Sequence, residues 1–254
     1  MGKLDERVAM ITGAGGMIGS RAAELFASEG AIVVLVDRDE APLAVAARRV
    51  GSRSSVVTAD VTRPDDVARA VAEAASRHGG IDVLVLNAGV EGVVRPIPEY
   101  PLDVFDHVMA VNVRGVFLGL QHGMPALQAR GGGSIVITSS IAGLHGFAGG
   151  SAYATSKHAV VGLMRCAALE GAAHGIRVNT VNPAPLEGRM MRSLENGMAP
   201  GHGDRARELM LQAIPARRYG DADDVARLML FLASDDSRYC TGGVYSVDGG
   251  MSAA

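Results

Sequence analysis

The chain has 254 residues, which suits one large α/β domain or at most two small ones. Hydrophobic residues make up 48% and charged residues 20% of the sequence, the balance of an ordinary globular protein. The formal net charge is only −3 and no segment forms a basic stripe, so nucleic acids and anionic membranes are not expected partners.

Short apolar runs alternate with longer amphipathic segments along the chain. The runs predict strands at residues 8–12, 31–36, 55–59, 82–86, 134–138, 177–182 and 244–247. The amphipathic segments predict helices at residues 17–28, 64–77, 102–128, 151–173 and 221–233. Most runs are continuously apolar, as in parallel strands that are buried on both faces. We therefore predict a single α/β domain, residues 1–254, with a Rossmann-type doubly wound parallel sheet of about seven strands flanked by helices.

Residues 187–218 interrupt this rhythm. The segment contains four methionines, together with Pro200, Gly201 and Gly203. It is either a surface loop of low order or a mobile lid with an adaptable apolar underside. The lid becomes the better interpretation once a cofactor site is placed beneath the segment.

The two cysteines, Cys166 and Cys240, lack the spacing of metal ligands or of a redox pair, and we expect no metal site. Both lie among apolar residues, which favours buried thiols in a reducing compartment. Residues 1–7 have no signal-peptide pattern, and no apolar run approaches the roughly 18 residues of a membrane span. A cytoplasmic location is therefore expected.

A glycine-rich turn follows the first predicted strand and precedes a predicted helix. Glycines let the backbone approach a pyrophosphate, and the helix N-terminus offers free N–H groups and a favourable dipole to the anion. A tight turn without a ligand is the alternative, but strand, turn and helix occur in the order that dinucleotide binding requires. The phosphate-binding residues would be Gly13, Gly15, Gly16, Met17, Ile18 and Gly19.

Asp37 follows the second predicted strand, at the distance from the glycine turn where an acidic residue accepts hydrogen bonds from a ribose. Such a carboxylate would repel the 2′-phosphate of NADP. Arg38 could instead pair with that phosphate, and a solvated turn carboxylate is a further alternative. Because the glycine turn contains no lysine or arginine, we predict NAD in preference to NADP.

Tyr153 and Lys157 are four positions apart in a predicted helix, so they share one face of it. A free phenol has a pKa of about 10, too high for a base at neutral pH. A nearby ammonium favours the phenolate and would lower the pKa of Tyr153. A packed tyrosine with a solvated lysine is the alternative, because this spacing is common by chance.

Several short motifs in one order resemble the short-chain dehydrogenase/reductase family, in its soluble single-domain branch, over essentially the whole chain. They are the glycine turn, Asp60-Val61, Asn87-Ala88-Gly89, Asn112, Thr138-Ser139-Ser140, the Tyr153 to Lys157 segment, Asn182-Pro183 and Asp248-Gly249-Gly250. The resemblance implies an oxidoreductase that acts on CH–OH groups by hydride transfer to or from a nicotinamide dinucleotide.

The resemblance also implies roles for single residues. Ser140 would hydrogen-bond the substrate oxygen, Tyr153 would exchange the hydroxyl proton, and Lys157 would bind the nicotinamide ribose as well. Asn112 would hold a kink and a water that extends the proton path, whereas Ser139 would be structural. Further cofactor contacts would come from Asp37, Arg38, Asp60, Val61, Asn87, Ala88, Gly89, Val111, Thr138, Pro183, Ala184 and Leu186.

Three positions depart from the family pattern. Met17 and Ala184 stand where the family usually has glycine. Gly188 stands where threonine or serine commonly anchors the nicotinamide carboxamide, so that anchor is missing and the backbone of Leu186 remains. The lid is therefore expected to order less completely around the cofactor.

The expected substrate pocket is walled by residues 90–96, 141–150 and the lid, which are mostly apolar or small. These walls favour a hydrophobic secondary alcohol or its ketone. Glu91 and Arg95 are expected to be solvated, and His145 to be a loop residue.

Two other functions stay open. A 3-oxoacyl-thioester reductase would want a basic rim, which only Arg95, Arg189 and Arg192 could offer. A non-catalytic NAD-binding sensor or scaffold would have no use for a proton relay.

The helix around residues 158–170 is apolar on nearly all sides, which predicts burial against both the core and a partner subunit. In the resembling family, this helix and the Asn112 helix build a homotetramer. The alternative is a helix that is buried wholly within one subunit.

Overall fold

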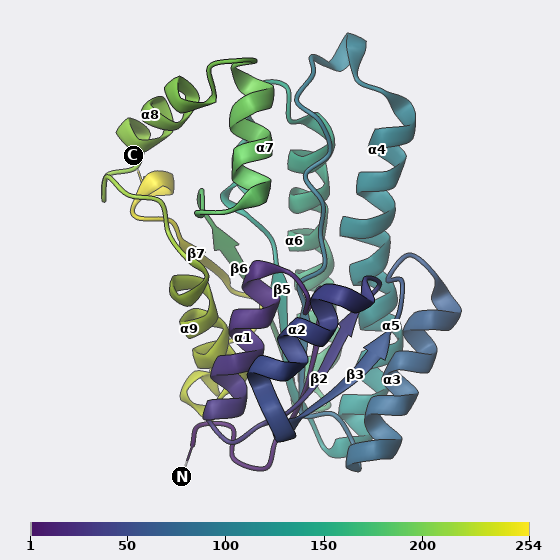
Figure 1. Ribbon diagram of the computed structural model, residues 1–254. Helices are drawn as coiled ribbons and strands as arrows, with labels where there is room; N and C mark the ends of the chain where they lie inside the picture. The colour runs from purple at the N-terminus through teal and green to yellow at the C-terminus, as the bar shows by residue number, and fades with distance from the viewer. Residues whose placement is uncertain (1, 254) are drawn as a thin grey trace.

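Seven parallel strands form one sheet in the order β3-β2-β1-β4-β5-β6-β7 (Figure 1). The computed structural model describes residues 2–253. The strands are β1 Val8–Thr12, β2 Ile32–Asp37, β3 Ser54–Thr58, β4 Val83–Leu86, β5 Gly133–Thr138, β6 Ile176–Pro183 and β7 Val244–Val247. All seven predicted strands are confirmed to within one or two residues at each end.

The helices are α1 Met17–Ser28, α2 Glu40–Val50, α3 Pro64–His78, α4 Leu102–Met109, α5 Gly115–Arg130, α6 Ser151–Ala172, α7 Arg189–Met198, α8 Gly203–Ala213 and α9 Ala222–Ala233. The helix predicted at 102–128 is confirmed as a continuous helical stretch, but a π-helical turn at Ala110–Arg114 divides it into α4 and α5. Helix α2 is absent from the predicted set: it buries only Leu43 and Ala46, too narrow an apolar face to stand out in the sequence.

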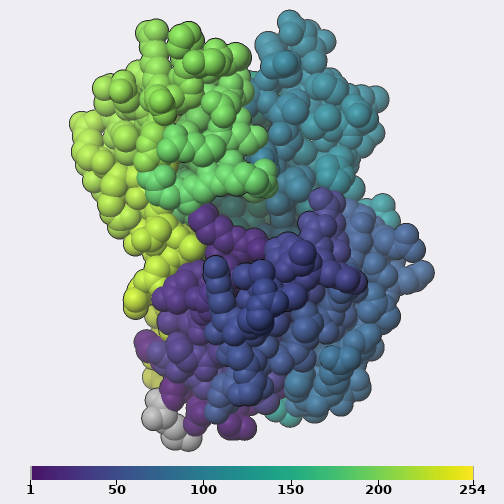
Figure 2. Space-filling model, viewed as in Figure 1, coloured from purple at the N-terminus to yellow at the C-terminus, as the bar shows by residue number. Residues whose placement is uncertain are grey.

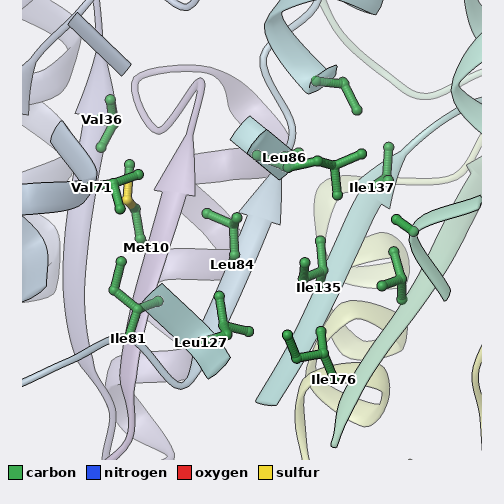
Figure 3. Close-up of a cluster of buried hydrophobic side chains, with 14 of the residues drawn as sticks. Met10, Val36, Val71, Ile81, Leu84, Leu86, Leu127, Ile135, Ile137 and Ile176 are labelled. Atoms are coloured by element: carbon green, nitrogen blue, oxygen red, sulfur yellow. The ribbon is translucent and has the colours of Figure 1, made fainter. Parts of the chain in front are cut away.

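Helices cover both faces of the sheet and build two layers of core. Side chains of α1, α2 and α9 pack on one face, and those of α3, α5 and α6 on the other. Met10, Leu84 and Ile135 lie side by side across β1, β4 and β5 and are almost completely buried (Figure 3). Each such side chain contributes about 2 kcal/mol by leaving water. The predicted fold class, a doubly wound parallel sheet, is confirmed.

The strand order reverses its direction between β1 and β4. At such a switch point the loops after neighbouring strands diverge to opposite faces, which opens a crevice at their carboxyl ends. The turn after β1, the residues after β4 and the ends of β5 and β6 all meet there. The fold thus brings the predicted site segments together at the carboxyl ends of the central strands.

Both predicted buried thiols are wrong for the single chain. Cys166 is exposed and Cys240 is half-buried. Cys166 lies on the outward face of α6, beside Arg165 and Leu169, because a helix packed on a sheet buries only one stripe. No helix within residues 2–253 is long and apolar enough to cross a membrane.

Candidate active site

The glycine turn is held in place by side chains from β1 and β4. Thr12 Oγ1 accepts hydrogen bonds from the Asn87 and Ala88 N–H groups, at 3.0 and 3.3 Å. Asn87 Nδ2 donates in turn to the Thr12 and Gly13 carbonyls, at 3.2 and 3.3 Å. Gly13 has a φ of +66°, and a Cβ there would lie 2.8 Å from the Ala88 Cα. This turn therefore needs glycine, and it leads directly into the N-terminus of α1.

Asp37 and Arg38 are placed differently. Asp37 Oδ2 accepts the Gly15 N–H at 2.9 Å, so this carboxylate faces the glycine turn. The Arg38 side chain is exposed and its Nε lies 3.8 Å from Asp39 Oδ2. The solvated-turn alternative for Asp37 is not supported, because its carboxylate is fixed against the turn.

The remaining cofactor candidates line the same crevice from further strands. The Asp60 carboxylate accepts the Thr62 N–H and hydroxyl, both at 2.8 Å, and a Cβ on Gly115 would meet Val61 at 3.0 Å. A Cβ on Gly89 would lie only 3.4 Å from Lys157 Nζ. The crevice thus combines the backbone at the N-terminus of α1, the fixed Asp37 carboxylate and the Gly89 backbone, which has no side chain, beside Lys157. These residues fit a nicotinamide dinucleotide.

Tyr153 and Lys157 lie together on α6, as their spacing predicts. Lys157 Nζ is 5.5 Å from the centre of the Tyr153 ring. The lysine is 4% exposed, and its Nζ donates to the Thr138 carbonyl at 2.8 Å. Burial lowers the pKa of Lys157 to about 8. The alternative of a packed tyrosine with a solvated lysine is therefore wrong.

Ser140 begins a short 3₁₀ turn after β5. Its Oγ donates to the Pro183 carbonyl at 3.3 Å and accepts the Ala142 N–H at 3.1 Å. Asn182 Nδ2 donates to the Ser140 carbonyl at 2.9 Å, so β6 fixes the backbone that carries the hydroxyl. Ser139 points the other way: it is buried, and its Oγ donates to the Lys157 carbonyl at 3.0 Å.

Asn112 is the centre of the π-helical turn between α4 and α5. Its Oδ1 accepts the Val90 N–H at 2.8 Å, and its Nδ2 donates to the Val90 carbonyl and to Ser156 Oγ, both at 2.9 Å. Ser156 Oγ donates to the Tyr153 carbonyl at 2.7 Å. The side chain thus ties the π-turn to the loop after β4 and to α6. Ser156 was not among the predicted site residues, because nothing in the sequence indicates which side chain a serine inside a helix will contact.

The pKa of Tyr153 does not follow the expectation. The pKa is raised to about 12 overall: burial of the phenol is the largest cause, a hydrogen bond with Ser140 lowers it, and the Glu91 carboxylate adds a smaller rise. No lowering by Lys157 is found, and desolvation of the phenol sets the direction of the shift.

Glu91 is buried rather than solvated, which corrects the expectation. It is 8% exposed, and its Oε1 lies 3.0 Å from the Arg189 guanidinium at the start of α7. The ion pair could not be predicted from the sequence, because Glu91 and Arg189 are far apart along the chain. Arg95 and His145 are exposed, as expected.

The three expected pocket walls contact one another. A Cβ on Gly197 of α7 would lie 2.8 Å from Val94 Cγ2, and the Arg95 N–H donates to the Gly149 carbonyl at 3.0 Å. In Figure 2 the green segment with α7 and α8 and the purple N-terminal segment border a hollow near the middle of the molecule.

Residues 187–218 carry two helices, which share a small core with the residue that follows the segment. Met191, Ile214 and Tyr219 form that core, and Glu195 is 1% exposed beneath it. The Glu195 carboxylate accepts the Tyr219 hydroxyl at 2.9 Å and lies 3.2 Å from the Arg192 guanidinium. The beginning of the segment is joined to the residues that follow its end by a hydrogen bond from the Glu187 N–H to the Gly220 carbonyl. This structure excludes a surface loop of low order.

Comparison with known proteins agrees with this geometry. Residues 13–252 match a family model described as enoyl-(acyl carrier protein) reductase. The chain is 36% identical to levodione reductase of Leifsonia aquatica, over 99% of this chain and 96% of that one. It is 37% identical to cyclohexanol dehydrogenase of an Acinetobacter species, over 97% and 95% of the two chains.

Solved structures agree with the sequence relatives. The crystal structure of levodione reductase superposes with a TM-score of 0.96 over 99% of both chains. That of NAD⁺-bound xylitol dehydrogenase, 32% identical, superposes with a TM-score of 0.94 over 98% of this chain and 100% of that one. The chain belongs to the short-chain dehydrogenase/reductase family and is an oxidoreductase that acts on CH–OH groups with a nicotinamide cofactor.

Proposed function

We propose that the protein is an NAD-dependent dehydrogenase of hydrophobic secondary alcohols, and the reductase of the matching ketones, with Tyr153 as general acid and base. One observation carries the proposal: Ser140, Tyr153 and Lys157 meet at the edge of the sheet where the glycine turn opens. A phenol, a hydroxyl and a buried cation together can hold a substrate oxygen and move its proton.

The nicotinamide supplies the hydride chemistry when it is bound. Ser140 and Tyr153 hold the substrate oxygen by their hydroxyls. During oxidation the phenolate form of Tyr153 would accept the hydroxyl proton of the alcohol, and during ketone reduction the phenol form would donate its proton to the same oxygen. The protonated ammonium of Lys157 stabilises the negative charge of the Tyr153 phenolate. Asn112 positions these groups, because its amide joins the π-turn to the helix that bears Tyr153.

Asp37 supports the choice of NAD over NADP. Its carboxylate is held by the Gly15 N–H at the turn, so a 2′-phosphate there would meet a fixed negative charge. Arg38, whose side chain is exposed beside Asp39, offers at most partial compensation.

The pocket walls support an apolar substrate. Two relatives are named levodione reductase and cyclohexanol dehydrogenase, and cyclohexanol is an apolar cyclic secondary alcohol. A thioester of an acyl carrier is the second candidate, which the description of the matching family model favours. A non-catalytic NAD sensor would leave the arrangement of Tyr153 and Lys157 unused.

The test is an absorbance assay at 340 nm with cyclic secondary alcohols, a linear polyol and a 3-hydroxyacyl thioester, each with NAD and NADP. We expect the highest kcat/KM with a cyclic alcohol and NAD. A clear preference for the thioester or for NADP would contradict the corresponding part of the proposal. Binding of NADH without turnover of any substrate would favour the sensor.

A further inference from the structure

Two departures from the family pattern, at positions 17 and 188, contact each other in the structure. Met17 is the first residue of α1 and is 43% exposed. A Cβ built on Gly188 would lie 3.0 Å from Met17 Sδ and 3.2 Å from its Cε. The methionine side chain therefore occupies the space into which any side chain at position 188 would project.

This contact joins the two sides of the crevice. Met17 belongs to the glycine turn and α1, whereas Gly188 is the residue directly before α7, where the lid begins. The next residue, Arg189, pairs with Glu91 on the loop after β4. The start of the lid is thus fastened on one side by an apolar contact and on the other by an ion pair.

Position 188 is free of backbone strain, so the obstacle there is the methionine. Gly188 has a φ of 160°, an extended value that other residues adopt. A side chain at position 188 would require Met17 to move. Methionine is unbranched and polarisable, which suits a contact that must open and re-form as a ligand enters.

We propose that Met17 is a positioning residue which closes the lid over the bound dinucleotide by packing on Gly188, in place of a polar anchor at position 188. The proposal rests on the proposed cofactor site. It makes positions 17 and 188 one unit, in which a large side chain at one requires a small residue at the other.

The test is a double-mutant cycle read out as the dissociation constant of NADH, measured by fluorescence titration. We expect Met17→Ala to weaken NADH binding several-fold, and Met17→Leu to retain most of the affinity. Gly188→Thr alone should also weaken binding, because its side chain displaces Met17. In Met17→Ala with Gly188→Thr the loss should be clearly smaller than the two single losses combined.

Val45→Ala is the matched control. Val45 is an exposed apolar residue of α2 that lines the same surface groove as Met17, of about 500 Å³, so its truncation should leave the NADH dissociation constant unchanged. Thermal unfolding without NADH identifies any variant that is merely destabilised.

Tryptic cleavage after the exposed Arg189 and Arg192 gives a second readout of lid closure. NADH should slow this cleavage strongly in the native protein and in Met17→Leu, but weakly in Met17→Ala. Native NADH affinity in Met17→Ala, or additive losses in the cycle, would overturn the proposal. If the native protein itself bound no NADH, the proposed function would fail instead.

Discussion

Two neighbouring side chains have opposite effects on the pKa of Tyr153, and a substitution at one of them can separate these effects. The Glu91 carboxylate raises the pKa of the phenol, whereas the hydrogen bond with Ser140 lowers it. Glu91 also pairs with Arg189, which is exposed at the start of the lid. Glu91 therefore both affects the Tyr153 phenol and binds the first residue of α7.

Glu91→Gln removes that negative charge and should lower the pKa of Tyr153. Alcohol oxidation needs a phenol that can accept a proton, so the rising limb of kcat/KM against pH should move to lower pH. Glu99→Gln, an exposed position in the following segment, should leave the profile unchanged. A shift of the limb to higher pH in Glu91→Gln would contradict the assignment.

Lys157 is a group for which function and stability conflict. Its pKa is about 8 in the folded protein and 10.5 in an unfolded chain. Below pH 8 the lysine is protonated in both states, and its buried charge destabilises the fold. Between pH 8 and 10.5 the unfolded chain binds more protons, so stability rises with pH and the penalty disappears.

Lys157→Met should therefore unfold at higher denaturant concentration at pH 7 while losing activity. The free energy of unfolding should rise by about 2 kcal/mol, since the pKa shift is partly offset by the lost hydrogen bond to Thr138. The gain over the native protein should shrink as the pH rises towards 10.5. Lys3→Met, at an exposed lysine, should show no gain at pH 7; equal behaviour of both variants would count against this account.

At the scale of residues, contacts between residues close in the sequence could be predicted from their spacing, whereas contacts between distant residues could not. Tyr153 and Lys157 are found together because a helix places residues four apart on one face. The burial of Glu91 could not be predicted, because a carboxylate is buried only where a cation from elsewhere meets it. The contact of Met17 with Gly188 depends on the same kind of distant meeting.

Among the elements, the segment 187–218, which we propose to be a lid, is stabilised around Glu195. This carboxylate is almost fully buried and is satisfied by Tyr219 and Arg192. Arg207 also covers the Tyr219 ring, with its guanidinium 4.4 Å from the ring centre. A buried carboxylate is tolerated only with such partners, so the network should hold α7 and α8 together.

Glu195→Ala should loosen the lid without unfolding the sheet. It leaves the buried Tyr219 hydroxyl without its acceptor, which costs about 1–3 kcal/mol locally. Arg192 is half exposed and stays 3.7 Å from Asp204. Tryptic cleavage within residues 187–218 should accelerate, and the KM for substrate should rise by several-fold. Glu208→Ala, at an exposed position of α8, serves as the control. Cleavage of the Glu195 variant at the native rate would show that the network does not hold the lid.

The strands were predictable as elements because buried parallel strands form continuous apolar runs. The π-turn at Asn112 was not, because nothing in a helical pattern marks an inserted turn; only the resemblance suggested a kink. The helices of the lid escaped prediction because glycine and proline interrupt their sequence and their core is shared with Tyr219, beyond the segment itself.

Over the whole molecule, the outer faces of α5 and α6 each expose a large apolar side chain. Phe117 is 49% exposed and Leu169 is 82% exposed on these two contacting helices. A helix buried wholly within one subunit is therefore excluded for α6. We propose that these faces pair with further copies of the chain in a homotetramer.

Leu169→Glu or Phe117→Glu should split the assembly, because each would bury a charge in an apolar interface. Light scattering coupled to size-exclusion chromatography measures the mass. We expect a native mass of four chains and smaller species in both variants, with no change in Leu209→Glu on α8. A monomeric native protein would refute the assembly.

The role of the Tyr153 hydroxyl in moving the substrate proton is tested by the rate of NADH formation from a secondary alcohol in Tyr153→Phe, followed at 340 nm. The variant keeps the ring and loses only that hydroxyl, so kcat should fall by about 10² to 10⁴ while the NADH dissociation constant stays close to native. A kcat within about twofold of the native value would contradict the account.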